Sequence, residues 1–335
     1  MKIKSNRLGI WPAAAVLLLW LAAASCDNEN GVFPVDGGSP AEEELVPLGI
    51  ETSLDAEIAP SARAEVTSGS LGVYKYPDAV YNTEYAYVSG AWTATTPILV
   101  GQRMVSVTAV YPRETPLATA GDKVTFPAFR EYSAANDLCY AFTGTPASVS
   151  NLNPNINLTL KHLYARIKVK VGLATGDTGS GMLNSVKLEF YNTKNGTQGN
   201  AKISTAGISI SDGTLFAGTG TTATAYSQTI EETLTSGTTN DTFDMLGCSL
   251  DGWQLGGDAS ANEAVTAVVI TVKFDGQLYQ TKIPASTFVP GGLIAGKQYT
   301  VTLNLMSGVG VTAGTVTVND WSTTSDAGSH DIVIS

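Results

Sequence analysis

Short segments in which apolar and polar residues alternate recur along most of this chain, and they constrain its fold more than any other feature. Residues 299–305, for example, alternate aromatic or aliphatic side chains with threonine and asparagine. A period of two indicates a strand with one buried face. Glycine, proline, asparagine and aspartate bound most of these segments and favour turns. The pattern predicts an all-β fold made of β-sandwiches or barrels.

The first half of the chain is predicted to form a series of short strands. We expect an opening strand over residues 45–58 and an exposed loop over 59–65, where Pro60 blocks strand pairing. Further strands are expected at residues 71–76, 84–89, 104–111, 123–126 and 138–142. About 310 residues would remain after removal of a leader, more than one core usually serves. With a polar break at 146–154, we predict an N-terminal domain over 45–150 and a C-terminal domain over 151–335.

The second half contains one change of phase and one clear hairpin. Leu158 and Leu160 share a face, whereas the apolar residues from Leu163 onward fall on the opposite face. This change predicts a β-bulge near residues 161–162. Residues 268–284 are predicted to form a hairpin with Asp275-Gly276 at its tip, because that dipeptide readily takes the positive φ values of a type I′ turn.

The N-terminus has the layout of a secretory signal peptide over residues 1–25. Three basic residues precede an apolar run at 8–24, which is short for a membrane span and ends in small residues. Residues 23–26 resemble the lipobox of bacterial lipoproteins, which predicts cleavage before Cys26 and lipidation of its thiol. Several acyl chains would give stable anchoring. The alternative is an ordinary signal peptide with a chance cysteine. Residues 26–44 lack apolar periodicity and are expected to form a flexible tether.

Charge and cysteine content narrow the class of protein. The formal net charge of −11 argues against nucleic acid as a partner, because nucleic acid attracts basic surfaces. Beyond Cys26 the chain has Cys139 and Cys248, so one disulfide is arithmetically possible. Both lie among apolar residues, and we favour buried free thiols.

Motifs for catalysis are missing from the sequence. The chain has two histidines, His162 and His330, and no HExxH, GxSxG, CxxC or phosphate-loop motif. We therefore predict that the protein is not an enzyme and has no cofactor and no metal. A hydrogen-bonded residue of a sheet is the favoured interpretation of His162, and a catalytic base is the alternative.

Two binding hypotheses remain open beside this prediction. Asp-Gly dipeptides at 212–213, 251–252 and 275–276 offer oxygen ligands of the kind calcium prefers, although they are also ordinary turn dipeptides. Large aromatic side chains could form a platform for sugars, although core packing is the simpler interpretation. The residues considered for this platform are Trp92, Trp253, Trp321, Tyr81, Tyr85 and Tyr87.

Several segments together resemble the fimbrillin-like surface lipoproteins of the Bacteroidetes, in the branch of the major and minor fimbrial subunits. The acidic residues directly after Cys26 also resemble a surface-export signal of that phylum. The resembling segments are 62–64, 71–74, 105–112, 137–141, 158–166, 295–299 and 319–321. The resemblance implies two transthyretin-like β-sandwich domains in tandem. It also implies a structural or adhesive pilus subunit, or an accessory protein, located at the outer membrane and in the fimbrium.

In that family a trypsin-like protease cuts after an arginine that follows the first strand, and the strand is lost. A C-terminal strand of the next subunit then fills the groove by β-strand addition. Arg63 is the only basic residue between Cys26 and Lys75, which makes it the candidate processing site. The expected partners are other fimbrial subunits, the outer membrane through the lipid, and a host or bacterial surface receptor. The alternative function is a non-polymerising surface lipoprotein that binds glycan or host protein.

The origin of a donor strand stays open at this stage. Only residues 330–335 form a strand-like segment after the linker that follows Trp321. Residues 314–321 could supply more donor length, or they could be a fixed strand of the fold.

Overall fold

The computed structural model describes residues 44–55, 66–77, 80–133, 135–144, 147–194, 197–200, 206–217, 225–248, 265–289 and 293–321. These residues form β-strands joined by turns and one four-residue helix, α1 (Ala285–Phe288). The all-β prediction is confirmed. No helix in this described part is long and apolar enough to cross a membrane.

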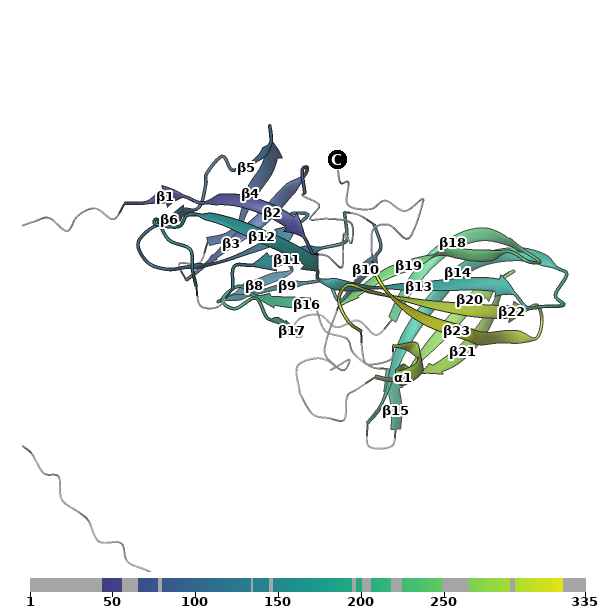
Figure 1. The fold of residues 1–335 in the computed structure, drawn as a ribbon. Helices are drawn as coiled ribbons and strands as arrows, with labels where there is room; N and C mark the ends of the chain where they lie inside the picture. The colour runs from purple at the N-terminus through teal and green to yellow at the C-terminus, as the bar shows by residue number, and fades with distance from the viewer. Residues whose placement is uncertain are drawn as a thin grey trace, which may run out of the picture. The chain divides into compact units, whose positions relative to one another are not determined.

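A seven-stranded sheet forms the first layer, in the order β2-β12-β11-β7-β3-β4-β5 (Figure 1). All its pairs are antiparallel except β2 with β12. β1 (Val46–Pro47) and β6 (Leu99–Val100) form a separate antiparallel pair. The strands are β2 (Gly49–Leu54), β3 (Ser70–Tyr76), β4 (Val80–Val88), β5 (Ala91–Thr93), β7 (Ser106–Tyr111), β11 (Cys139–Phe142) and β12 (Asn155–His162).

A four-stranded sheet combines strands from both halves of the sequence. Its order is β17-β16-β9-β8, with β8 (Ala118–Ala120), β9 (Lys123–Phe126), β16 (Ala206–Ser209) and β17 (Leu215–Ala217). Val124, Phe126 and Ile208 of this sheet belong to one buried cluster with Tyr74 and Val110 of the seven-stranded sheet. The four-stranded sheet thus covers one face of the seven-stranded sheet, and a second buried cluster that includes Val107, Ala109 and Trp92 lies on the other face, which explains why every residue of β7 is buried.

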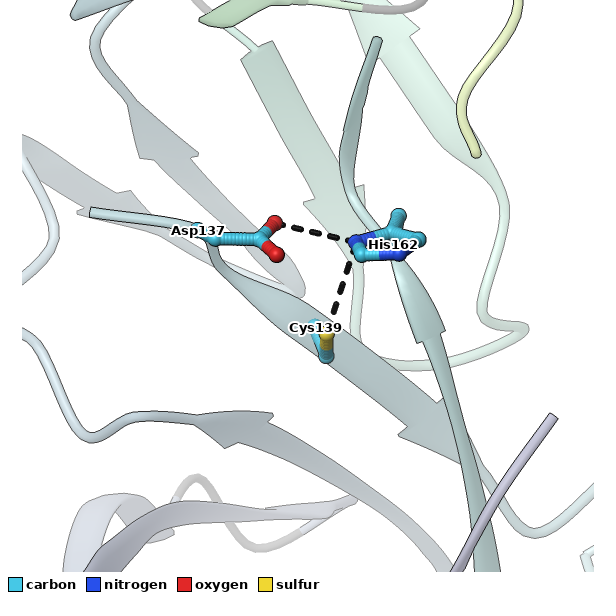
Figure 2. Close-up of side chains that lie close together, drawn as sticks. All are labelled: Asp137, Cys139 and His162. Carbon is cyan, nitrogen blue, oxygen red and sulfur yellow. Dashed lines mark hydrogen bonds and ion pairs between the residues drawn. The ribbon is translucent and has the colours of Figure 1, made fainter. Parts of the chain in front are cut away.

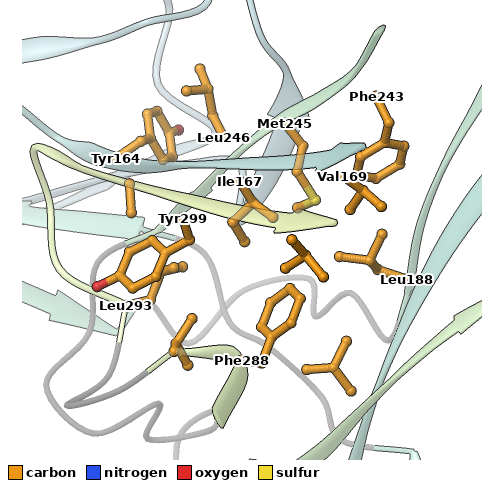
Figure 3. Packing of buried hydrophobic residues seen from close by; sticks show 14 of the residues in the cluster. Tyr164, Ile167, Val169, Leu188, Phe243, Met245, Leu246, Phe288, Leu293 and Tyr299 are labelled. Carbon is orange, nitrogen blue, oxygen red and sulfur yellow. The ribbon is translucent and has the colours of Figure 1, made fainter. Parts of the chain in front are cut away.

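The last two sheets pack face to face as a β-sandwich. One has the order β10-β19-β13-β22-β23, and the other has the order β15-β14-β20-β21 with β18 paired to β14. Side chains such as Ile167, Phe243 and Tyr299 from the first meet Leu188 from the second and Phe288 from α1 (Figure 3). The strands are β10 (Phe129–Glu131), β13 (Tyr164–Leu173), β14 (Ser180–Lys194), β15 (Thr197–Asn200), β18 (Ala225–Thr235), β19 (Thr239–Cys248), β20 (Val265–Phe274), β21 (Gln277–Pro284), β22 (Lys297–Met306) and β23 (Gly310–Asp320).

The change of phase near residue 162 marks a passage between sheets, so the prediction of a bulge there was wrong. The chain leaves the seven-stranded sheet at His162, breaks at Leu163 and enters the five-stranded sheet at Tyr164. The Leu163 N–H still donates to Leu138 O at 2.7 Å. Residues on either side of Leu163 face different cores, which reverses the apolar face. The irregularity of β13 lies between Val169 and Val171.

Strand pairing crosses the domain boundary that the sequence suggested at residues 150 and 151. β12 pairs with β11 and β2 in the seven-stranded sheet, β16 pairs with β9, and β10 pairs with β19. The division of the chain into a domain over 45–150 and a domain over 151–335 stays a prediction. The chain passes from one sheet to the other at Leu163, where the sequence showed a change of apolar face but not its cause.

Two local predictions can be compared directly with the structure. The hairpin of β20 and β21 turns at Asp275-Gly276, whose φ values are 48° and 77°, as the dipeptide predicts. The opening strand expected over 45–58 is present as β1 and β2, which end at Leu54. The continuation after Asp55, including the loop with Arg63, lies outside the described residues.

Candidate functional site

The first candidate site is β2, which forms one edge of the seven-stranded sheet. It pairs with β12 in parallel, from Gly49 opposite Asn155 to Leu54 opposite Leu160. The Gly49 N–H donates to Pro154 O at 3.0 Å, and the Asp55 N–H donates to Leu160 O at 2.8 Å. Because β2 has one neighbour in the sheet, a single ladder of backbone hydrogen bonds holds it there.

Side chains of β2 close the apolar core on that side of the sheet. Ile50, Thr52 and Leu54 are all buried. Ile50 and Leu54 belong to a cluster with Leu158 and Leu160 of β12. An edge strand that closes a core contributes buried apolar side chains as well as backbone hydrogen bonds. Its loss would therefore expose apolar side chains and an unpaired strand edge.

Thr52 links β2 to two other parts of the chain by hydrogen bonds. The indole Nε1–H of Trp92 donates to Thr52 Oγ1 at 3.1 Å, and the Thr52 hydroxyl donates to Val66 O at 3.4 Å. Trp92 lies on β5, edge-to-face with Tyr87 and Tyr111 at ring centroid distances of 5.3 and 6.4 Å. Thr52 was not singled out in the sequence, because its partners lie far from it along the chain.

The predicted site residues Cys26 and Arg63 both lie outside the described residues. The structure does describe the two ends that flank the loop with Arg63, which are Asp55 after β2 and the buried Val66. Lipidation at Cys26 and cleavage after Arg63 therefore stay predictions.

The second candidate site is a buried polar group where the chain passes between sheets. His162 Nδ1 lies 3.0 Å from Asp137 Oδ1 and 3.8 Å from Cys139 Sγ (Figure 2). All three side chains are buried. His162 Nε2 is also buried and has no hydrogen-bond partner. The sequence indicated neither the partnership of Asp137 nor that of Cys139.

Aromatic and cationic side chains complete this junction. The ring of Trp321 stacks on His162 with a centroid distance of 4.0 Å and an interplanar angle of 7°. The Arg166 guanidinium lies over the ring of Tyr132 and forms an ion pair with Asp244 at 2.5 Å. Trp321 follows β23 directly, so the stack ties the end of that strand to the place where β12 ends.

The chemistry of the junction is that of a hydrogen-bonded structural group. Burial, and next the charge of Asp137, raises the pKa of the Cys139 thiol well above its usual value, which keeps it protonated. The ligand atoms of Asp137, Cys139 and His162 all lie within 4.8 Å of one another, so a metal bound there would have to displace the proton of the thiol and the hydrogen bond between His162 Nδ1 and Asp137. Cys139 is free, so the disulfide alternative does not hold for it. The side chain of Cys248 lies outside those described.

The alternative binding sites do not match the arrangement of the described residues. Trp92, Tyr85 and Trp321 are buried in cores, which contradicts a sugar platform built on them. Trp253 lies outside the described residues. Asp212 Oδ1 accepts hydrogen bonds from the N–H and hydroxyl of Thr214, and Asp275 Oδ1 accepts one from the Met182 N–H. The Asp212 carboxylate thus serves its own turn, and the Asp275 carboxylate joins its turn to β14, while residues 251–252 are not described.

The possible donor segment at residues 314–321 is part of the fold here. β23 pairs with β22 in antiparallel orientation from Gly310 to Asp320. Trp321 then enters the core. The segment is therefore a fixed strand in this structure, at the edge of the five-stranded sheet opposite β10.

Comparison with solved structures finds one similar fold with a TM-score above 0.5 and others with lower scores, all at low sequence identity. A protein proposed to act in cell adhesion from Bacteroides ovatus ATCC 8483 has a TM-score of 0.51 and 14% identity, covering 83% of this chain and 98% of its own. A similarly described protein from Bacteroides uniformis ATCC 8492 has a TM-score of 0.48 and 16% identity, covering 86% and 100%. The fimbrial anchor protein Mfa2 from Porphyromonas gingivalis has a TM-score of 0.40 and 11% identity, covering 82% and 98%.

Comparison with curated proteins finds no match. A family model, in contrast, matches most of the chain: the model described as fimbrillin-like aligns with residues 61–321. The aligned part starts after β2 and ends at Trp321. This chain therefore belongs to the fimbrillin-like family.

Proposed function

We propose that this protein is a structural or adhesive subunit of a cell-surface fimbria that is exported as a lipidated precursor. In this proposal Cys26 carries the lipid that anchors the precursor to the outer membrane. Cleavage after Arg63 then releases β2, and a strand from another subunit takes its place. Tandem transthyretin-like sandwiches are the fold that we associate with this mechanism.

The observation that carries the proposal is the position of β2. It is an edge strand, it pairs with one neighbour, and its buried side chains close a core. The chain between Asp55 and Val66 contains Arg63, so one cut there separates β2 from the rest of the sheet. An opened edge with exposed apolar side chains binds a replacement strand strongly, because backbone pairing and apolar burial are both recovered.

Limited trypsin digestion of the chain without its signal peptide tests this proposal. We expect a cut after Arg63, identified by N-terminal mass mapping, and a cut product that binds a separate strand at the opened edge, measured by native size analysis with an added peptide of residues 45–55. Arg63→Ala is the test variant, and Lys75→Ala is the matched control because Lys75 is the next basic residue along the chain. If Arg63→Ala releases residues 45–55 like the parent chain, or if the cut product binds no added strand, assembly through β2 is wrong.

Lipidation is tested separately by metabolic labelling with a radioactive or clickable fatty acid. We expect label in the parent precursor and none in a Cys26→Ser variant. Cys139→Ser serves as the control, because its thiol is buried in the fold. Label that persists in Cys26→Ser would place the modification elsewhere. A parent precursor without label would favour the ordinary signal peptide.

A non-polymerising surface lipoprotein that binds glycan or host protein is the alternative function. Saturable glycan binding by an uncleaved monomer would favour it.

A further inference from the structure

The buried indole N–H of Trp92 depends on a side chain of β2. Trp92 is 7% exposed, and its Nε1–H donates to Thr52 Oγ1 at 3.1 Å. Indole nitrogen is only a donor, so it needs an acceptor wherever it is buried. Under the proposed function, on which this inference rests, Thr52 leaves with β2 while Trp92 stays. The departure of β2 leaves this donor without its acceptor.

A second polar group is exposed by the same departure. The Thr52 hydroxyl donates to Val66 O at 3.4 Å, and Val66 is buried. Val66 lies three positions after Arg63, in the part of the chain that remains after the cut. A hydroxyl can accept one hydrogen bond and donate another from a small volume. Valine has nearly the same shape as threonine but can do neither.

The positions on either side of Thr52 require apolar side chains. Ile50 lies opposite Ile156, and Leu54 lies opposite Leu160, in the parallel register of β2 and β12. Both side chains of β2 are buried in the cluster that includes Leu158. Since side chains at i, i+2 and i+4 of a strand share one face, the groove has an apolar, a hydroxyl and an apolar position in that order.

We propose that the groove left by β2 selects a strand of a different subunit that carries an apolar residue, a serine or threonine, and an apolar residue at positions i, i+2 and i+4. Residues 310–335 of this chain contain no such triplet. A strand taken from that region of a second copy would leave the Trp92 N–H and the Val66 carbonyl unpaired. The hydroxyl thus makes the groove selective for a heterologous partner.

The intact chain tests the role of the hydroxyl without any cleavage. Thr52→Val and Thr52→Ser are compared by NMR hydrogen exchange of the Trp92 indole N–H, with exposed Thr317→Val as the matched control. We expect exchange to accelerate about tenfold or more in Thr52→Val, and to change little in Thr52→Ser and in the control. Parent-like protection of the indole in Thr52→Val would overturn the inference.

The cut chain then tests selection of the partner strand. Synthetic peptides of residues 45–55 with threonine, serine or valine at position 52 are titrated onto protein from which β2 has been removed, beside a peptide of residues 325–335. We expect the threonine and serine peptides to bind about tenfold or more tightly than the other two. Equal affinity for the valine peptide, or tight binding of residues 325–335, would overturn the inference. Resistance of Arg63 to cleavage would instead contradict the proposed function, and the exchange measurement would still decide the role of the hydroxyl.

Discussion

β2 and β23 are both edge strands, yet they are held in different ways. β2 has six residues, pairs in parallel and buries most of its side chains. β23 has eleven residues, pairs in antiparallel orientation and exposes most of its side chains. β23 is stabilised by its backbone hydrogen bonds to β22 and by the buried Trp321 at its end. β2 is stabilised mainly by the side chains that it buries in the core.

This difference separates β2, for which we propose exchange, from β23, which is a fixed strand in this structure. Loss of β2 would open a core, which creates a strong site for another strand. Loss of β23 would mostly uncover backbone, because few of its side chains reach a core. The predictions below test this comparison, starting with the largest expected effect.

Trp321→Ala should lower the free energy of unfolding by about 3–5 kcal/mol, because a large buried side chain is removed and His162 loses its stacking partner. Guanidinium unfolding followed by circular dichroism measures this change. Val318→Ala on the same strand is the control, since Val318 is 41% exposed and should change stability by less than about 0.5 kcal/mol. Equal effects of the two variants would mean that backbone pairing alone fixes β23.

Leu54→Ala should destabilise the intact chain by about 2–5 kcal/mol, toward the lower end because an edge strand can relax around the void. Exposed Glu51→Gln on the same strand is the control. In the cut chain refilled with a parent peptide the Leu54→Ala effect should vanish, whereas the Trp321→Ala effect should persist. An effect of Leu54→Ala that survives removal of β2 would show that the strand had not left.

Asp137→Ala should cost about 1–3 kcal/mol, because it takes away the buried acceptor closest to His162 Nδ1. Asp137→Asn keeps the shape and an acceptor oxygen, so we expect a smaller loss by the same unfolding measurement. If both variants leave stability unchanged, the hydrogen bond between Asp137 and His162 does not help to stabilise the packing of Trp321 at the end of β23.

The smallest effect that we expect is a loss of stability at alkaline pH, which arises in the buried cluster that contains Tyr85 and Tyr111. Burial raises the pKa of Tyr85 and of Tyr111, so the fold favours their neutral forms. This stabilisation is fully present below the unfolded tyrosine pKa of about 10 and is lost as pH rises through the folded pKa. Unfolding midpoints measured across that range should fall less steeply in a chain that has lost β2, where both rings gain water.

A matched pair of variants gives the control for this pH series. Tyr85→Phe should reduce the loss of stability at alkaline pH, whereas Tyr76→Phe, at an exposed position, should not. At neutral pH, Tyr85→Phe should cost stability, because the Ile98 N–H donates to the Tyr85 hydroxyl at 2.9 Å. An identical alkaline slope in the parent and Tyr85→Phe chains would assign the loss to other groups.

Local pattern predicted many strands and the β20–β21 hairpin, but not the pairing of strands that lie far apart in the sequence. Alternation in residues 299–305 and the Asp275-Gly276 turn need only neighbours along the chain, and both are correct in the structure. The reversal of apolar face near His162 was also visible in the sequence, but its cause was not. A bulge and a passage between sheets produce the same local signal, and only the partners of β12 and β13 distinguish them.

The candidate site was predicted only in part for a related reason. The sequence singled out residues 45–58 and Arg63, because a strand followed by a basic loop is a local pattern. It did not single out Thr52, whose partners Trp92 and Val66 are 40 and 14 positions away. Nor did it join Asp137, Cys139 and Trp321 to His162, since these residues meet only after two sheets have formed.

By itself the sequence determined the strand-rich class and an opening strand followed by Arg63, because alternation, turn residues and charge act between near neighbours, whereas the leader over residues 1–25 stays a prediction. Tertiary structure alone decided that β2 lies at an edge, that Thr52 joins the Trp92 indole to Val66, and that Trp321 fixes β23. Those features depend on hydrogen bonds and burial between distant residues, and such contacts have no local pattern in the chain.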